Sequence, residues 1–514
     1  MENKMIRTMT NKRLKPLIST MKLIPIALSI SFLTSCSHMN LAIDEDNTEQ
    51  VGGVQENITP TLDSTITLEK VTLDVAYLSS DELKGRDNFS TEIHIAADYI
   101  AKRFTEVGLI PDSTAPNFKQ QYTVQKIKPG ALNVEINGQV IDKDALAMVT
   151  TVTDIQWSRT SNQANQANQA NQNDKKSPYL KDLLVNTVII GENDNMRKSL
   201  RKLNHQGGQH LVLLHPKHEK SFKRYQSYFA NGLTTLVNKL ESKQGGVIVI
   251  ALTNIDKVKQ YTVKGNAEVS NTTLSNVIGV LPGKSKANEI VLYSAHYDHL
   301  GVKPTNDEKL SNTEPKGSNI FNGADDDASG VSAIINLANH FAKMANNERT
   351  LMFSAFSAEE LGGFGSRHFS AQIDPNQITA MINIEMIGKP ATFGEGSVWM
   401  TGMERSNLGE QLNQVLATQD LNIYADPYPK EKLFYRSDNA TLARLGVPAH
   451  SFSSTQLDKD QHYHQVTDDI NSLNIPSMLQ VIKTLAIATT PLVDGSITPS
   501  RIDPNKVKRQ GLIY

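Results

Sequence analysis

Short apolar runs alternate with longer segments of helical periodicity along the second half of the chain. The apolar runs are rich in β-branched residues, whereas the segments between them repeat apolar positions at helical spacing. These patterns predict strands at 276–280, 290–294, 350–355, 380–384, 398–401 and 449–452, and helices at 331–344, 408–418 and 437–445. The alternation predicts an α/β fold with one doubly wound, mostly parallel sheet flanked by helices.

Breaks in this pattern divide the chain into segments. We predict the main part of the α/β domain at 271–514 and its N-terminal part at 68–128, where apolar residues again recur at helical spacing. Residues 129–270 interrupt the pattern with short strands, and we interpret them as an inserted, smaller, β-rich domain. Within it, 161–173 repeats Asn-Gln-Ala without an apolar period, which is typical of a low-complexity loop.

The N-terminus carries an export pattern. Basic residues precede an apolar run at 23–33 that is too short to cross a membrane, and Leu33-Thr-Ser-Cys36 resembles the bacterial lipobox, whose cysteine is lipidated. We therefore predict a signal peptide at 1–35, lipidation of Cys36 and a flexible, polar tether at 36–67. Because Ser37 follows the cysteine, we expect a membrane-anchored lipoprotein at the bacterial outer membrane, facing the periplasm.

Composition narrows the classes of partner. The chain has 514 residues, 39% of them hydrophobic and 21% charged, with a net charge of −2. This is the composition of an ordinary globular protein of two or three domains. Since basic residues are not in excess, we expect no nucleic-acid partner. Cys36 is the only cysteine, so an intramolecular disulfide is excluded.

Polar side chains follow the predicted strands where each one ends. Ligands of open α/β sheets bind beyond the carboxyl ends of the strands, and imidazole and carboxylate groups are ligands of zinc. A single histidine there could be solvated, and three acids could cap the helix near Ala328, but the repetition at three strands favours a metal site. The residues concerned are His296, Asp298, Asp325, Asp326, Asp327, Glu359, Glu360 and Glu385.

Five motifs in order carry a resemblance to a known family. His296-Tyr-Asp298, Gly-Ala-Asp-Asp-Asp-Ala-Ser-Gly, Ala-Glu-Glu-Leu-Gly, Asn-Ile-Glu-Met-Ile-Gly and Tyr-His-Gln-Val-Thr-Asp-Asp resemble the M28 family of dizinc aminopeptidases. The resemblance covers 71–127 and 273–493 and implies a zinc exopeptidase fold with two Zn²⁺ ions. It implies that Asp326 bridges the ions, with His296 and Glu385 completing one site and Glu360 and His464 the other.

The resemblance also implies roles around the metals. Glu359 would be the general base. Asp298 lies on the same strand face as the histidine two positions before it, and we predict that its carboxylate accepts that imidazole's second N–H. Tyr463 would stabilise the oxyanion, as a tyrosine does in some family members. We interpret His299 and His462, which flank these residues, as surface or rim residues.

Three positions depart from the family or lie at its margins. Glu385 stands where the family usually has aspartate, and glutamate ligates zinc equally well. Asn439 follows Asp438 where the family usually has histidine, and Asp438 can be read as a helix cap. The resemblance implies that Arg86 faces the cleft loosely, but we interpret it as a solvated turn arginine. The inserted segment resembles the protease-associated domain found in many of these aminopeptidases.

Together these patterns predict a zinc-dependent aminopeptidase that hydrolyses N-terminal residues from peptides with a free N-terminus. Metal-activated water would attack the peptide carbonyl while a glutamate acts as the general base. Another hydrolase or a glutaminyl cyclase on the same fold is an alternative, the cyclase with a single zinc. A different class is an inactive, peptide-binding lipoprotein.

Overall fold

The computed structural model describes residues 60–160, 185–237, 245–303, 319–508 and 513. The predicted signal peptide at 1–35, the lipidation site Cys36 and the loop at 161–173 lie outside these residues and stay predictions. Among the described residues, no helix combines the length and the apolar character needed to span a membrane.

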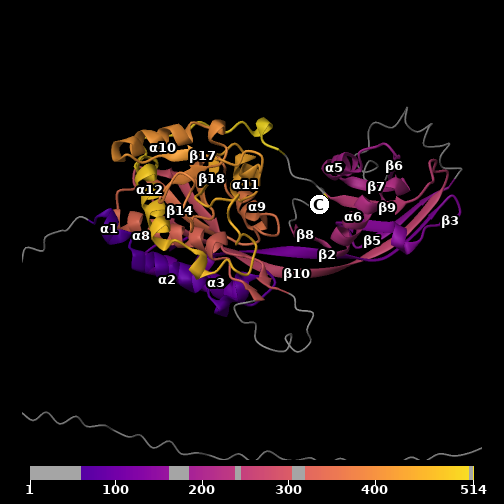
Figure 1. The fold of residues 1–514 in the computed structure, drawn as a ribbon, viewed down its shortest axis with the longest axis horizontal. Helices are drawn as coiled ribbons and strands as arrows, with labels where there is room; N and C mark the ends of the chain where they lie inside the picture. Colours follow the sequence, from indigo (N-terminus) through magenta and orange to yellow (C-terminus); the bar gives the residue numbers. More distant parts are fainter. Residues whose placement is uncertain (1–59, 161–184, 238–244, 304–318, 509–512, 514) are drawn as a thin grey trace, which may run out of the picture. The chain divides into compact units, whose positions relative to one another are not determined.

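A mixed sheet of twelve strands forms the centre of the fold (Figure 1). Its main path is β17 (Ile423–Ala425), β16 (Val398–Met400), β18 (Ala449–Ser453), β15 (Ile378–Ile384), β11 (Lys286–His296), β14 (Arg349–Phe356), β10 (Tyr261–Leu281), β2 (Lys119–Ile136) and β3 (Gln139–Val140). The four strands β18, β15, β11 and β14 are parallel, whereas β10 and β2 are antiparallel to their neighbours. The predicted α/β class is confirmed, and its parallel part is the middle of the sheet.

Three short strands extend this sheet beside the main path. β1 (Ile110–Pro111) and β5 (Asp154–Arg159) pair with β10, and β8 (Leu233–Leu236) pairs with β2.

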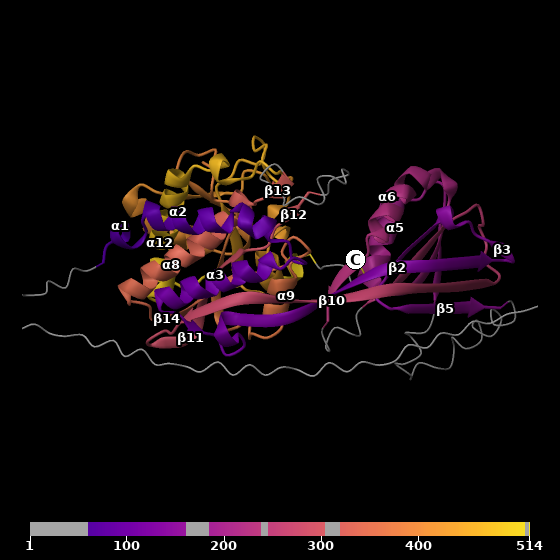
Figure 2. The same ribbon diagram turned by 90° about the horizontal axis from the view of Figure 1, so that it is seen from below.

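Helices cover both faces of the parallel strands. One face packs against α2 (Leu68–Leu78), α3 (Glu92–Val107), α8 (Gly330–Met344), α10 (Leu408–Leu416) and α12 (Ile475–Val493); the other packs against α9 (Phe364–Ser370) and α11 (Asn439–Ala443). Along β14, Leu351 and Phe353 enter the first core while Met352 and Phe356 enter the second. Because successive side chains of a strand point to opposite faces, burial of both faces requires the near-continuous apolar runs seen in the sequence. Figure 2 shows α2, α3 and α8 side by side.

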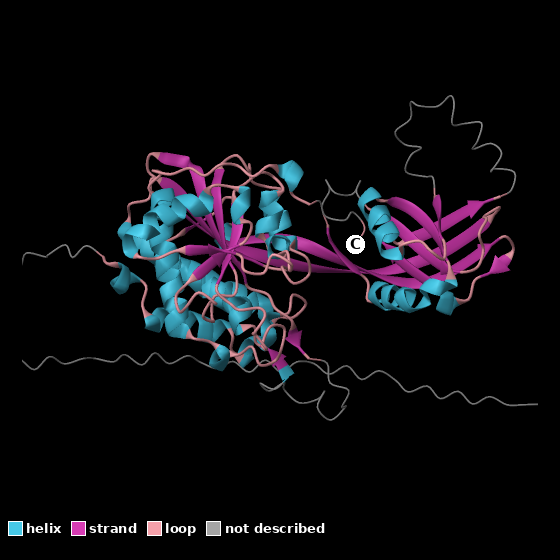
Figure 3. Ribbon diagram, turned by 45° about the horizontal axis from the view of Figure 1, so that its top comes forward, coloured by secondary structure: helices cyan, strands magenta, loops and turns pink. Residues whose placement is uncertain are grey.

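The inserted segment builds a second, four-stranded sheet. Its order is β4 (Leu146–Thr150), β9 (Gly246–Leu252), β7 (Gly208–Leu214) and β6 (Asn186–Ile190). The helices α5 (Met196–Gln206) and α6 (Glu219–Ala230) bury Leu200 and Phe222 against one face of it (Figure 3). The short strands expected in this segment are therefore present.

The predicted limits of the insertion do not coincide with element boundaries. β2 pairs with β10 from Lys119 opposite Val277 to Ile136 opposite Tyr261, so positions 129 and 270 lie inside two continuous strands. The reason is local: Pro129 and Gly130 are typical turn residues, yet here they lie at a β-bulge, where the register with Gly265 and Ala267 shifts and a strand tolerates proline. The two segments thus share a pair of strands.

The predicted tether at 36–67 extends too far along the chain. Residues from Thr61 onward form α1 (Leu62–Thr65), and Ile66 is fully buried. Thr65 Oγ1 lies 2.7 Å from Nδ1 of His340 in α8. Thr61 and Thr67 each cap a helix through their side chains, so these two polar residues mark helix starts here and not a tether.

Candidate metal centre

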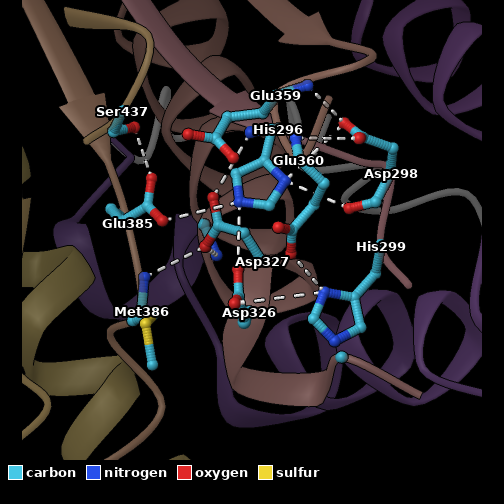
Figure 4. Close-up of polar contacts among 12 residues, drawn as sticks. His296, Asp298, His299, Asp326, Asp327, Glu359, Glu360, Glu385, Met386 and Ser437 are labelled. Carbon is cyan, nitrogen blue, oxygen red and sulfur yellow. Dashed lines mark hydrogen bonds and ion pairs between the residues drawn. The ribbon is translucent and has the colours of Figure 1, made fainter. Parts of the chain in front are cut away.

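The carboxyl ends of three adjacent parallel strands bring the predicted site residues together (Figure 4). His296 is the last residue of β11, Glu359 and Glu360 follow β14, and Glu385 follows β15 directly. Asp326 comes from the turn η7 (Ala324–Ser329) that leads into α8. Parallel strands end at one edge of a sheet, so residues far apart in sequence converge there.

His296, Asp326 and Glu385 form a first set of donor atoms that can hold a metal ion. His296 Nε2 lies 3.0 Å from Asp326 Oδ1 and 3.5 Å from Glu385 Oε1. The other ring nitrogen, Nδ1, lies 3.0 Å from the backbone carbonyl of Asp298, which can only accept a hydrogen bond. With the proton on Nδ1, the lone pair of Nε2 faces two carboxylate oxygens.

The surroundings of His296 Nε2 show whether a metal ion fits between these donor atoms. This buried atom has no hydrogen-bond partner among the described residues, although carboxylates surround it. Burial opposes protonation of His296, yet the Glu385 and Asp326 carboxylates raise its pKa well above the usual value. The arrangement demands positive charge between imidazole and carboxylates, and a divalent cation supplies it.

A second set of donors lies on the other side of Asp326. His464 Nε2 is 3.2 Å from Asp326 Oδ2 and 3.3 Å from Glu360 Oε1. His299 Nδ1 is 2.9 Å from Glu360 Oε1 but 4.0 Å from Asp326 Oδ2. The two oxygens of Asp326 therefore face different sets, and all five predicted ligands converge on one centre.

His299 is a member of this centre that the sequence interpretation missed. Its side chain is fully buried, so its interpretation as a surface or rim residue is wrong. The signal was its place three residues after His296 in His-Tyr-Asp-His. His462 bonds to Thr467 instead, away from the two donor sets.

Asp298 acts on the two glutamates, and the predicted contact of its carboxylate with the imidazole is wrong. Its Oδ1 lies 3.7 Å from His296 Nδ1, which bonds to the Asp298 carbonyl oxygen instead. The carboxylate accepts hydrogen bonds from Asn88 Nδ2 at 2.7 Å and from the backbone N–H groups of Glu359 at 3.1 Å and Glu360 at 3.2 Å. The chain leaves the regular strand after His296, so the predicted alternation of side chains no longer holds. Asp298 fixes the turn that carries both glutamates.

Glu359 stands beside the two sets without belonging to either. Its side chain lines a cavity together with Glu360 and Tyr463. Burial raises the pKa of Glu359 well above its ordinary value, and the neighbouring carboxylates of Glu385 and Asp438 act in the same direction. The group is thus placed to carry a proton.

Tyr463 lies at the mouth of the centre. Its ring stacks on the imidazole of His464 with the centroids 3.9 Å apart. Its hydroxyl oxygen accepts a hydrogen bond from Arg436 Nη2 at 3.0 Å. A phenol that accepts this bond keeps its own O–H for donation to a third group.

Asp438 and Asn439 lie at the start of α11. The side chain of Asp438 makes no capping hydrogen bond to α11, so it does not act as a helix cap. Burial raises its pKa to about 7. Asn439 is buried and donates to the carbonyls of Phe434 and Ala449, which gives it a structural role.

Arg86 supports the centre from the N-terminal part of the domain. The arginine is 1% exposed, so its interpretation as a solvated turn residue is wrong. Its guanidinium donates to four backbone carbonyls, those of Leu78, Tyr297, Asn322 and Gly323. Burial lowers its pKa to about 10, against the opposing effect of nearby aspartates, so it stays charged at neutral pH. No local pattern indicates this role, because the four acceptors come from three separate segments.

Lys389 is a second, partly buried cation that sequence reasoning did not find. Its Nζ lies 3.3 Å from Asp325 Oδ2, 3.0 Å from Asp460 Oδ1 and 3.7 Å from Asp468 Oδ1. Asp468 in turn accepts the N–H of Asp326 at 3.2 Å, and Asp460 accepts the N–H of Tyr463 at 3.0 Å. Lys389 therefore links the loop of the shared carboxylate to the loop of His464.

Fold and site together define an α/β protein with a histidine–carboxylate metal centre at the carboxyl edge of its sheet. Residues 276–489 match the family model described as Peptidase family M28. This match over 276–489 confirms the resemblance recognised in the motifs.

Two curated proteins are similar to part of this chain. A probable leucine aminopeptidase of Trichophyton verrucosum is 28% identical over 217 residues, 40% of this chain and 54% of that protein. Aminopeptidase YwaD of Bacillus subtilis is 27% identical over 165 residues, 30% of this chain and 32% of that protein. The chain thus spans about half the length of the first relative and about a third of the second.

Two solved structures align over most of the chain. An aminopeptidase from Aneurinibacillus sp. strain AM-1 covers 87% of this chain and 98% of its own, at 16% identity and a TM-score of 0.47. BSAP, a zinc aminopeptidase from Bacillus subtilis, covers 86% of this chain and 99% of its own, at 17% identity and a TM-score of 0.47.

Proposed function

We propose that this protein is a zinc-dependent aminopeptidase that removes the N-terminal residue from peptides with a free N-terminus. The observation that carries the proposal is the geometry of Asp326, whose two carboxylate oxygens face two histidine–carboxylate sets while Glu359 lies beside both. The peptidase family M28 domain and the names of the relatives agree with it.

The proposed centre holds two zinc ions. His296 and Glu385 would complete one site, Glu360 and His464 the other, with Asp326 shared. We assign His464 rather than His299 to the second ion because its Nε2 is nearly equidistant from the two carboxylate oxygens. His299 donates to Glu360 and so orients it. When bound, the ions polarise the scissile carbonyl and acidify the attacking water.

The chain's own side chains would move the protons. Glu359 takes a proton from the water as its oxygen attacks the carbonyl carbon, and returns it to the amine nitrogen as the C–N bond breaks. Tyr463, held by Arg436, donates its O–H to the oxygen on which negative charge develops. Asp298 keeps Glu359 and Glu360 in place through their backbone N–H groups.

The test compares matched substrates on purified, zinc-loaded protein. We expect hydrolysis of aminoacyl substrates, no hydrolysis of their N-acetylated counterparts, two zinc ions per chain, and loss of activity on chelation that zinc reverses. Glu359→Gln is the control for a folded, metal-loaded but inactive site. One tightly held ion together with cyclisation of N-terminal glutamine would support the cyclase instead, and peptide binding without any turnover would support the inactive binding protein.

We also propose that a lipid on Cys36 anchors the protein at the outer membrane, facing the periplasm. The support is the sequence around Cys36, with a basic region, a short apolar run and Leu-Thr-Ser before the cysteine. The wild type is expected in the membrane fraction, and Cys36→Ser is expected to be misprocessed or released. Identical fractionation of the two, with no lipid found on the wild type by mass spectrometry, would refute this location.

A further inference from the structure

Two cavities open beside the metal centre and share Arg436, Ser437 and Tyr463 in their walls. The first, which we call the arginine cavity, measures about 300 Å³ and is lined by Glu359, Arg436 and Arg444 among others. The second, which we call the apolar cavity, is lined by Glu385 together with Met386, Trp399, Leu433 and Leu457. A peptide lying across the centre has one end on each side.

The position of Glu359 decides which end enters which cavity. In the proposed reaction Glu359 gives its proton to the leaving amine nitrogen, so that nitrogen must lie within hydrogen-bond reach of its carboxylate. Glu359 lines the arginine cavity and not the apolar one. The leaving part of the peptide therefore occupies the arginine cavity, and the N-terminal side chain occupies the apolar cavity.

The lining of the arginine cavity includes two arginines beside Glu359 and Glu360. Arg444 is partly buried, and its Nε donates to the carbonyl of Lys508 at 2.9 Å, which holds the side chain in place. Arg436 is exposed and donates to Tyr463 at 3.0 Å. Arginine binds carboxylates through parallel N–H groups, and a cavity with two of them favours an anionic group.

The leaving part of a peptide has one fixed anion, its C-terminal carboxylate. In a dipeptide this group belongs to the same residue as the leaving nitrogen, and each further residue moves it away by about 3.3–3.6 Å. A cavity directly beside Glu359 can therefore receive the carboxylate of a dipeptide or tripeptide but not that of a long chain.

We propose that the arginine cavity binds the C-terminal carboxylate of short peptides through Arg444 and Arg436, which makes dipeptides and tripeptides the preferred substrates. This inference rests on the proposed aminopeptidase function and on Glu359 as its base. It assigns Arg444 as a specificity-determining residue that takes no part in the chemical step.

The experiment compares Ala-Ala with Ala-Ala-amide, which differ only in the terminal charge. For the wild type, kcat/KM is expected to be about 10- to 100-fold higher for the free acid, the range of one charged hydrogen bond. Arg444→Gln is expected to remove most of that preference through KM, and Arg444→Lys to keep part of it. The matched control is Arg224→Gln, which alters an exposed arginine of α6 in the inserted segment and should leave the preference intact.

Binding to Glu359→Gln gives a second measurement that does not depend on turnover. In calorimetric titrations this variant is expected to bind Ala-Ala about tenfold or more tightly than the amide. Equal kcat/KM values of the wild type for acid and amide, or an equal loss for both in Arg444→Gln, would overturn the carboxylate site while leaving the aminopeptidase intact. If zinc-loaded wild type hydrolyses neither peptide nor any longer one, the proposed function itself falls, and this site with it.

Discussion

Replacement of Arg86 by methionine is expected to destabilise the catalytic domain strongly. Methionine has a similar length but no donors, so four backbone carbonyls in the interior lose their hydrogen bonds at once. Hydrogen bonds from a charged donor contribute roughly 1.5–3 kcal/mol each. The loss is spread over the end of α2, the segment after His296 and the turn before Asp326.

Part of this loss is offset because the buried guanidinium itself is unfavourable. Burial lowers the pKa of Arg86 from its ordinary value to about 10, and that shift corresponds to about 3 kcal/mol that the neutral variant recovers. Four lost bonds less this recovery leave a loss of at least about 3 kcal/mol. We therefore expect Arg86→Met to lose about 3–5 kcal/mol of unfolding free energy, the range found when one partner of a buried charged network is removed. Arg86→Lys keeps the charge but not the fork of donors, so an intermediate loss is expected.

The assay is urea denaturation of zinc-free protein at neutral pH, followed by fluorescence, with Arg224→Met as the control for an exposed arginine. Zinc titration of the same variants provides a second measurement, because the carbonyls of Tyr297 and Gly323 adjoin the segments of His296 and Asp326. A loss below about 1 kcal/mol in Arg86→Met, the size of an ordinary surface substitution, would refute the reasoning.

Three further predictions concern the site and its surroundings. Glu359→Gln is expected to keep zinc and substrate binding but to lose about 10²–10⁴-fold in kcat, whereas Glu360→Gln should lose zinc first and regain activity with added zinc; equal zinc loss in both would contradict these roles. Lys389→Met is expected to weaken zinc binding about 10-fold or more in equilibrium dialysis, because it removes the contacts between the two loops. Lys389→Arg should stay closer to the wild type. An unchanged zinc affinity of Lys389→Met would show that the link between the loops is not needed. Burial lowers the pKa of His450 to about 4, so the unfolded chain takes up a proton before the folded protein does. The free energy of unfolding is therefore expected to fall by at most about 3 kcal/mol as the pH drops from about 6.5 to about 4. His450→Gln should flatten this pH dependence in urea titrations, and an unchanged dependence would assign it to other groups.

The centre of the fold could be predicted because its strands are buried on both faces. Such strands need continuous apolar runs, and these stand out from amphipathic helices by period and length alone. β2 and β10 could not be predicted in the same way, since Pro129 and Gly130 indicate a turn. Their strand conformation depends on the bulge between Gly265 and Ala267 of the partner strand, which no local pattern reveals.

The same distinction separates the site residues. His296, Glu360 and Glu385 each follow an apolar strand, so a local pattern placed them at one edge of the sheet. His299, Arg86 and Lys389 have no such pattern, because what defines them is the set of groups that folding brings to them. The carboxylates around Lys389 come from positions 325, 460 and 468, and only the tertiary structure brings them together.

Arg86 and Lys389 lie outside the two donor sets, and the charges of the surrounding carboxylates explain this position. Aspartates at 325, 326, 327 and 468 are all buried within the same region, and burial disfavours each ionised form. Lys389 pairs with the outer carboxylates, and Arg86 bonds to the backbone beside them, so the outer layer is held without any metal. The inner faces, where the oxygens of Asp326 meet His296 and His464, contain no lysine or arginine contact among the described ion pairs. A lysine placed there would satisfy the carboxylates and close the site. Leaving that charge to bound cations keeps the donors available, and it ties the integrity of the centre to the metals that the proposed reaction requires.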